Sequence, residues 1–308
     1  MGGFLGIDTS NYTTSVAFYN DSGITQCKRL LPVKEGERGL RQSDAVFHHT
    51  KAYPDLFKEL LSQTDGDIKA VGVSVTPTTA EGSYMPCFLS GISSASSISR
   101  ALEVPLYEFS HQAGHIRAAL YSSKAEFDGV FYAYHLSGGT FELLEVVSED
   151  HTYKVDIIGG SRDVTAGQLI DRIGVKLGLD FPCGAQLEAL ANENTKKITK
   201  PKVSVNGTYC NMSGGENLCL KLIENGAEKS ETAAYLTEFI RLTLEKMTDN
   251  LLEFSKSKDI IFSGGVSSNK TLSSFMKNKY GAFCAEPQFS QDNAAGVALL
   301  CMDRLNAD

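Results

Sequence analysis

The sequence lacks the features that would anchor it in a membrane or mark it for export. No stretch approaches the roughly 18 consecutive apolar residues of a membrane span, and no basic region precedes Asp8. The seven cysteines are widely spaced and include no C-x-x-C pair, which argues against a zinc knuckle or a dithiol redox site. Because their number is odd, reduced thiols fit best. We therefore expect a cytoplasmic protein without a membrane partner.

The sequence also lacks a P-loop and an excess of basic residues. The pattern G-x-x-x-x-G-K-[ST] does not occur, so the chain is not a P-loop ATPase. Lysine and arginine number 29 against 37 aspartates and glutamates, so the surface as a whole repels nucleic acid. An RNA partner would need a local basic patch. The most basic stretch runs from Lys196 to Lys202, and we expect it to be a surface loop.

One pattern of strands occurs twice in the 308 residues, a length that favours two packed domains. The strands are expected at residues 4–8, 14–19 and 24–30, and again, about 125 residues later, at 130–136, 141–147 and 153–158. A buried strand and a polar loop follow each copy, at 70–83 and 260–269. Helices are expected at 52–61, 91–102, 112–121, 166–177, 185–193, 231–255 and 293–305. Such a duplication predicts two similar α/β lobes.

Two histidines are spaced for a shared metal ion. His111 and His115 lie four residues apart, so a helix would place both rings on one face. Gln112 stands where the zinc proteases of the H-E-x-x-H type carry their general base, which disfavours a metalloprotease. A third ligand must come from elsewhere, and His135 and Asp292 are the candidates. Each has an ordinary alternative, because His135 fits a half-buried strand and Asp292 fits a helix N-cap.

Two glycine loops follow apolar strands at corresponding places in the two copies. Residues 137–139 and 263–265 both read Ser-Gly-Gly. Glycine permits positive φ and close approach of a ligand to the backbone, so the loops could cradle a nucleotide, although both could also be tight turns. Asp171, in an expected helix, could accept hydrogen bonds from ribose hydroxyls or pair with a surface charge.

Together these segments resemble the family of tRNA adenosine threonylcarbamoyltransferases, formerly described as glycoproteases. The matching segments span nearly the whole chain and are residues 5–10, 111–115, 137–139, 167–184, 263–269 and 292–295. The resemblance implies two duplicated α/β lobes of the actin, sugar-kinase and Hsp70 (ASKHA) type with a central nucleotide cleft. We expect one lobe at 1–107, completed by the C-terminal helix 293–308. The other is expected at 108–292, with most of the metal and nucleotide residues.

The resemblance also implies site residues and cofactors. The implied metal ligands are His111, His115 and Asp292, with His135 as an additional candidate where some members have a tyrosine. The implied nucleotide or substrate residues are Ser137, Gly138, Gly139, Asp171, Gly184, Glu188, Gly264, Gly265 and Asn269. One divalent metal, iron or zinc, is expected, because imidazole and carboxylate ligands suit both. The expected nucleotide ligand is threonylcarbamoyl-adenylate, or ATP or AMP.

The activity implied by the resemblance is transfer of a threonylcarbamoyl group from its adenylate to the exocyclic amine of an adenosine beside the tRNA anticodon, with AMP as the leaving group. The implied partners are tRNA, a smaller homologous subunit and a P-loop ATPase. No covalent nucleophile is required, and we assign no catalytic residue.

Four departures from the family pattern lie near the expected reaction centre. Tyr12 and Thr13 replace an adjacent Asp-Glu pair, residues 77–82 replace a Gly-Pro-Gly loop, Gln168 stands for a glutamate, and Glu216 stands for a lysine. They leave three hypotheses: a transferase acting on tRNA, a carbamoyl or phosphoryl transferase of the same fold acting on a small molecule, and a metal- and nucleotide-binding scaffold without catalysis.

Overall fold

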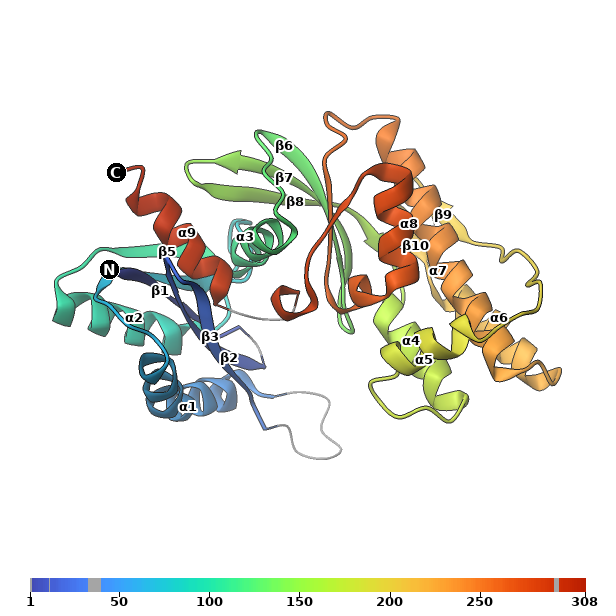
Figure 1. Cartoon of the computed structure of the whole chain (residues 1–308), viewed down its shortest axis with the longest axis horizontal. Helices are drawn as coiled ribbons and strands as arrows, with labels where there is room; N and C mark the ends of the chain where they lie inside the picture. Colours follow the sequence, from blue (N-terminus) through green and yellow to red (C-terminus); the bar gives the residue numbers. More distant parts are fainter. Residues whose placement is uncertain (1, 11, 33–39, 291–293) are drawn as a thin grey trace. The chain divides into compact units, whose positions relative to one another are not determined.

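The chain forms two compact α/β units, shown in Figure 1. The structure, a computed structural model, describes residues 2–10, 12–32, 40–290 and 294–308. Unit 1 comprises Met1–Gly129, Val147–Val155 and Gln288–Asp308, and unit 2 comprises Val130–Val146 and Asp156–Pro287. The first unit therefore extends to Gly129 rather than ending at residue 107. The reason is that helix α3 (His111–Ser123) packs on helix α9 (Ala295–Leu305) and on strands β4 (Ile68–Thr76) and β5 (Leu106–Ser110) of the same unit.

Unit 1 is built on a five-stranded sheet with the order β3-β2-β1-β4-β5. The strands are β1 (Gly3–Asp8), β2 (Thr13–Asn20), β3 (Gly23–Leu30), β4 (Ile68–Thr76) and β5 (Leu106–Ser110). The first three form an antiparallel meander, and β4 and β5 extend it in parallel from β1. Helices α1 (Gln42–Ser62) and α2 (Phe88–Leu102) pack against these strands. Apolar side chains such as Leu5, Val71 and Leu56 are buried there.

Unit 2 repeats this strand order. Its sheet has the order β12-β11-β6-β7-β8-β10-β9. The strands are β6 (Val130–Leu136), β7 (Phe141–Glu149), β8 (Thr152–Ser161), β9 (Ser204–Asn206), β10 (Tyr209–Asn211), β11 (Ile260–Ser263) and β12 (Phe283–Cys284). When β9 and β10 are left out and the second sheet is read from its other end, its order is β8-β7-β6-β11-β12. In both sheets the strands of the copy then follow the same order: third, second, first, fourth and fifth. The predicted duplication and the α/β fold class are confirmed.

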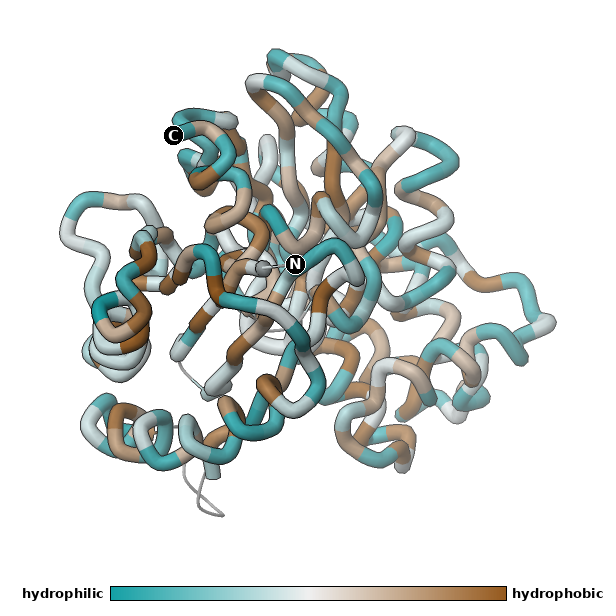
Figure 2. The backbone as a smooth tube through the Cα atoms, turned by 60° about the vertical axis from the view of Figure 1, so that its left-hand side comes forward, coloured by the Kyte–Doolittle hydropathy of each residue, from teal (hydrophilic) through white to brown (hydrophobic). Residues whose placement is uncertain are grey.

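The helices of unit 2 are α4 (Ala166–Lys176), α5 (Gly184–Asn192), α6 (Ser213–Glu224), α7 (Lys229–Leu252) and α8 (Lys270–Tyr280). Brown apolar and teal polar residues alternate along the helical tubes in Figure 2, as expected for helices that each cover a core with one face. Within the described ranges, no helix is both long and apolar enough to span a bilayer.

Helix α6 was not expected, because its first turn reads Ser-Gly-Gly-Glu and resembles a loop. Asp163 stabilises this turn: its carboxylate accepts hydrogen bonds from the Met212 N–H at 2.7 Å and the Ser213 N–H at 3.2 Å. Burial raises the pKa of Asp163, but these and other hydrogen bonds outweigh it and hold the pKa well below its usual range. Gly215 is required by packing, because an added Cβ would lie 2.6 Å from the Phe239 ring.

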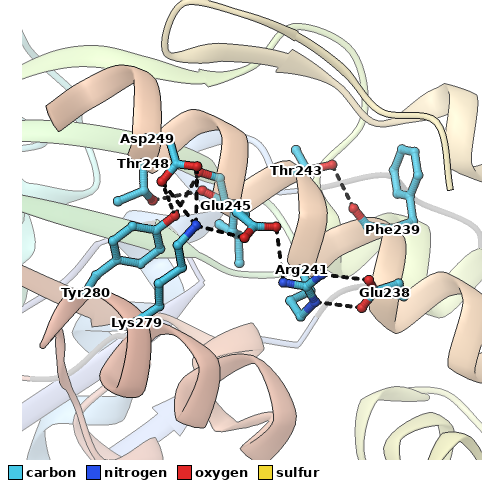
Figure 3. A network of polar contacts seen from close by, with 10 residues as sticks. Glu238, Phe239, Arg241, Thr243, Glu245, Thr248, Asp249, Lys279 and Tyr280 are labelled. Atoms are coloured by element: carbon cyan, nitrogen blue, oxygen red, sulfur yellow. Dashed lines mark hydrogen bonds and ion pairs between the residues drawn. The ribbon is translucent and has the colours of Figure 1, made fainter. Parts of the chain in front are cut away.

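An ion-pair network fastens α8 to α7 (Figure 3). Lys279 Nζ lies 2.8 Å from Glu245 Oε1 and 3.2 Å from Asp249 Oδ1, and Glu245 also pairs with Arg241 at 3.2 Å. The Tyr280 hydroxyl donates to Asp249 at 2.6 Å. The network therefore fixes the C-terminal end of α8 against α7.

Candidate metal and nucleotide sites

The two predicted metal-binding histidines face each other at the start of α3. The helix begins directly after β5, where the Ser110 hydroxyl accepts a hydrogen bond from the Ala113 N–H at 3.1 Å. This N-cap makes His111 the first residue of the helix, and His115 follows one turn later. Their Nε2 atoms are 2.9 Å apart. The prediction that the two imidazoles share one face is confirmed by this distance.

Asp8 lies behind the histidine pair and was not identified from the sequence. It ends β1, is fully buried, and its Oδ1 lies 3.0 Å from His111 Nδ1. The Ser10 hydroxyl donates to Oδ2 at 2.7 Å. Burial raises the pKa of Asp8, but the contact with His111 and the hydrogen bond from Ser10 outweigh it, so the net pKa lies below its usual value. A charged residue closing an otherwise apolar buried strand is the sequence signal that could have revealed it.

Glycines bring α9 close to both α3 and β1. An added Cβ on Gly296 of α9 would lie 1.8 Å from the Gly114 carbonyl oxygen, and one on Gly6 of β1 would lie 2.4 Å from the Ala294 carbonyl oxygen. At Gly114 itself, an added Cβ would lie 3.1 Å from the Val297 side chain of α9, so helix packing favours a small residue there as well. This packing fixes α3 relative to β1, and so His111 relative to Asp8.

The histidine pair fits a divalent metal ion. Two imidazole nitrogens 2.9 Å apart can both lie about 2.0–2.1 Å from one ion. Among the described residues, no group of three or more His, Cys, Asp and Glu side chains is arranged to hold a metal ion. The predicted third ligand, Asp292, lies outside the described residues. His135 belongs to unit 2, where its Nδ1 lies 3.4 Å from the Ser263 hydroxyl.

The two predicted glycine loops lie side by side in unit 2, so the prediction that they occupy corresponding places in the two copies is wrong. They follow β6 and β11, which are parallel neighbours with His135 opposite Ser263. Gly264 has φ +93°, and an added Cβ would lie 2.1 Å from the Leu136 carbonyl oxygen, so only glycine fits. At Gly138, Gly139 and Gly265, by contrast, a Cβ would meet no heavy atom of the described chain within 4 Å apart from the immediate neighbours. Packing therefore does not explain these three glycines.

The N-terminus of α4 lies against the first loop. An added Cβ on Gly167 would lie 2.5 Å from the Ser137 carbonyl oxygen, and the Thr165 hydroxyl donates to the Gly138 carbonyl at 2.9 Å. Further along, Asp171 accepts a hydrogen bond from the Cys183 N–H at 2.9 Å, immediately before Gly184. The predicted residues on both glycine loops and on α4 therefore belong to the same unit.

Glu188 and Asn269 hold the N-terminus of α8. Glu188 Oε1 accepts a hydrogen bond from the Lys270 N–H at 2.6 Å, and Asn269 Oδ1 accepts one from the Leu272 N–H at 3.0 Å. These contacts give both residues a structural role that the sequence did not suggest. Their contact with a nucleotide stays a prediction.

The departures from the family pattern have local partners. Gln168 and Thr165 form a capping box at the start of α4, with hydrogen bonds of 3.0 and 3.2 Å. Glu216 forms an ion pair with Arg172 at 2.9 Å. In the replaced loop at 77–82, the Pro77 carbonyl accepts a hydrogen bond from the Gln112 N–H at 3.1 Å, next to the histidine pair. The Tyr12 carbonyl accepts one from the Leu31 N–H at 2.7 Å.

Comparison with solved structures shows the fold. The dehydratase component A of Acidaminococcus fermentans, described as (R)-2-hydroxyglutaryl-CoA dehydratase component A, matches with a TM-score of 0.56 and 16% identity over all of both chains. A ROK family glucokinase from Streptomyces griseus matches with a TM-score of 0.51 and 12% identity, covering 98% of this chain and 99% of the glucokinase. These matches agree with the expected sugar-kinase type of fold.

Comparison with known sequences shows the family. The chain is 28% identical to a tRNA N6-adenosine threonylcarbamoyltransferase of Thermosipho melanesiensis, covering 96% of this chain and 92% of the relative. It is 27% identical to the enzyme of the same name in Enterococcus faecalis, covering 89% and 80%. The family model described as tRNA N6-adenosine threonylcarbamoyltransferase matches residues 34–299. The chain therefore belongs to the tRNA N6-adenosine threonylcarbamoyltransferase family and is a transferase.

Proposed function

We propose that this protein transfers a threonylcarbamoyl group from its adenylate to the exocyclic amine of an adenosine in tRNA, in a metal-dependent reaction that releases AMP. The observation that carries the proposal is the pair of imidazoles of His111 and His115, whose Nε2 atoms face each other 2.9 Å apart in a chain of this family. In the reaction, the amine nitrogen forms a bond to the carbamoyl carbon, and the bond from that carbon to the phosphate oxygen breaks. AMP leaves with the electron pair, and the amine gives up one proton.

His111 and His115 would hold the metal, with Asp292 as the third ligand. An ion held by two imidazoles and one carboxylate keeps open positions and, when bound, polarises phosphate or carbonyl oxygens. Iron and zinc both suit these ligands.

The glycine loops of unit 2 would bind the adenylate. The open space at Gly138, Gly139 and Gly265 supports this, because a phosphate group can approach the backbone there. The Gly139 N–H donates to the Ser137 hydroxyl at 3.2 Å, so the N–H groups of Gly138 and Gly265 are the proposed phosphate donors. Asp171 and Gly184 would contact the nucleoside. These residues contribute by positioning the adenylate, which lowers the entropic part of the barrier.

The proposed partners are tRNA, a smaller homologous subunit and a P-loop ATPase. The net charge of −8 means that tRNA binding must depend on a local basic surface or on a partner protein. Affinity for tRNA should then fall steeply with salt, because each phosphate contact releases a counterion.

A direct assay tests the proposal. The purified protein is incubated with threonylcarbamoyl-adenylate, unmodified tRNA and the candidate partner proteins, and modified adenosine is quantified by mass spectrometry. We expect product and one bound metal ion per wild-type chain, and loss of both in a His111→Ala/His115→Ala double variant. His48→Ala, on α1, is the matched control and should keep both. Product formation by a metal-free double variant would reject the metal dependence.

Glu216 favours a small-molecule acceptor as the second candidate. It stands where the family carries a lysine and it pairs with Arg172, so this position offers no free cation for a polyanionic substrate. Release of AMP with a small amine as acceptor, together with no detectable tRNA binding even at low salt, would favour this candidate. If neither acceptor is modified, both candidates fail.

A further inference from the structure

We infer that Asp8 is a positioning residue that holds the His111 ring in one tautomer and one orientation, so that His111 Nε2 is available to a metal ion. The inference rests on the proposed metal site and adds to it a residue from β1. It is carried by the contact of 3.0 Å between Asp8 Oδ1 and His111 Nδ1.

The donor and acceptor chemistry fixes the tautomer. An ionised carboxylate can only accept hydrogen bonds, so the proton in this contact belongs to Nδ1 of His111. In a neutral imidazole the other nitrogen, Nε2, then carries a lone pair. This is the atom that faces His115 Nε2 at 2.9 Å. A carboxylate behind a metal-binding histidine has this effect in many metal sites.

The geometry separates this role from that of a direct ligand. Asp8 contacts the Nδ1 side of the His111 ring, whereas His115 contacts the Nε2 side. A metal ion bound by both Nε2 atoms would therefore lie on the opposite side of the His111 ring from the Asp8 carboxylate.

The position of Asp8 is itself fixed. The side chain is fully buried, and the Ser10 hydroxyl and N–H both contact Oδ2, at 2.7 and 3.4 Å. Asn at position 8 would have to place its NH₂ group either against the Nδ1–H of His111 or against the Ser10 N–H. Asp8→Asn therefore keeps the size of the side chain and breaks this set of contacts.

The test uses the full chain and three measurements. Histidine-selective ¹⁵N NMR on metal-free wild type should show His111 protonated at Nδ1. Titration with Zn²⁺ against a competing chelator should show that Asp8→Asn weakens binding by about 10–100-fold. With Co²⁺ as the probe, the visible absorption spectrum of the Asp8→Asn variant should differ from that of wild type. Asp303→Asn is the matched control, because it removes a carboxylate that pairs with Arg117 of the same helix α3. It should lower the melting temperature and leave the Zn²⁺ affinity unchanged.

The outcomes separate this inference from the proposed function. If the wild-type protein binds no Zn²⁺, the proposed metal site is rejected. The tautomer of His111, measured by NMR on the metal-free protein, still decides whether Asp8 orients the ring. An Nε2-protonated His111 in wild type overturns the inference, and this measurement needs no variant to fold. Unchanged Zn²⁺ affinity in Asp8→Asn overturns it as well. Equal weakening in Asp303→Asn would assign the effect to looser packing of α3 and would also overturn it.

Discussion

Replacing Gly296 with alanine should push helix α9 away from α3 and weaken the metal site without touching any ligand. The added Cβ would lie 1.8 Å from the Gly114 carbonyl oxygen and 2.7 Å from its carbonyl carbon. Contacts of a Cβ below 3.0 Å are essentially never found, so the two helices must separate by more than 1 Å. Both colliding atoms belong to backbone, and no side-chain rotation can relieve the contact.

The magnitude follows from two opposing effects. Overpacking in a well-packed core costs about 1–3 kcal/mol, and a backbone collision belongs at the upper end. Gly296 lies in the first turn of α9, where alanine gains only a few tenths of a kcal/mol over glycine, and this offsets a small part of the cost. We expect a net loss of about 2 kcal/mol, which lowers the melting temperature of unit 1 by roughly 4–8 °C.

Differential scanning calorimetry and Zn²⁺ titration check this prediction together. Gly214→Ala is the matched control, because it lies in α6 and its Cβ would meet open space. That variant should gain a few tenths of a kcal/mol in stability. Gly114→Ala should be intermediate, since its Cβ would meet the movable Val297 side chain at 3.1 Å. If Gly296→Ala keeps both the wild-type melting temperature and the wild-type Zn²⁺ affinity, the packing argument is wrong.

Four further variants test unit 2. Gly264→Ala should lower the stability of unit 2 by about 3 kcal/mol, as measured by calorimetry. Gly265→Ala should leave this stability unchanged. It should weaken AMP binding roughly tenfold in a calorimetric titration, which corresponds to about one hydrogen bond. Asp163→Asn should destabilise α6 by roughly 1 kcal/mol at pH 7, allowing for solvent screening. Because the native pKa of Asp163 is lowered, its contribution is present above the unfolded pKa and is lost as the pH falls through the native pKa. The difference from wild type should therefore shrink between pH 5 and pH 2, and a constant difference would contradict the assignment. Lys279→Met should cost about 1 kcal/mol or less, and the cost should diminish in 1 M NaCl, as measured by urea unfolding.

The sheets could be predicted because their signal is local. Alternating apolar strands of the two meanders, at 4–30 and 130–158, have the period of strands, and their repetition indicates a duplicated fold. Strands β5, β9, β10 and β12 were not predicted, and the last three have only two or three residues, too few to show a period. Helix α1 begins ten residues earlier than expected, at Gln42, and continues through Pro54, where proline is normally read as a boundary.

The site residues could be predicted only in part, because their roles depend on neighbours distant in the sequence. His111 and His115 are visible as a pair because one helix turn brings them together. Asp8 is 103 residues from His111, and no spacing rule connects them. Glu188 was expected to contact a nucleotide, but its contact with the N-terminus of α8 depends on a helix 82 residues away that the sequence did not reveal.

The glycines of the chain illustrate how a motif can mix two kinds of constraint. Gly114 lies between two histidines, yet the atoms that require a small residue there belong to α9, and the most severe contact is made by Gly296. In the second glycine loop, Gly264 is required by its positive φ and by the Leu136 carbonyl, whereas neither constrains its neighbour Gly265. Substituting neighbouring glycines one at a time therefore separates residues that shape the site from residues that leave room for a ligand. A substitution that lowers stability and binding together reports on the first group, and only a loss of binding at unchanged stability identifies the second.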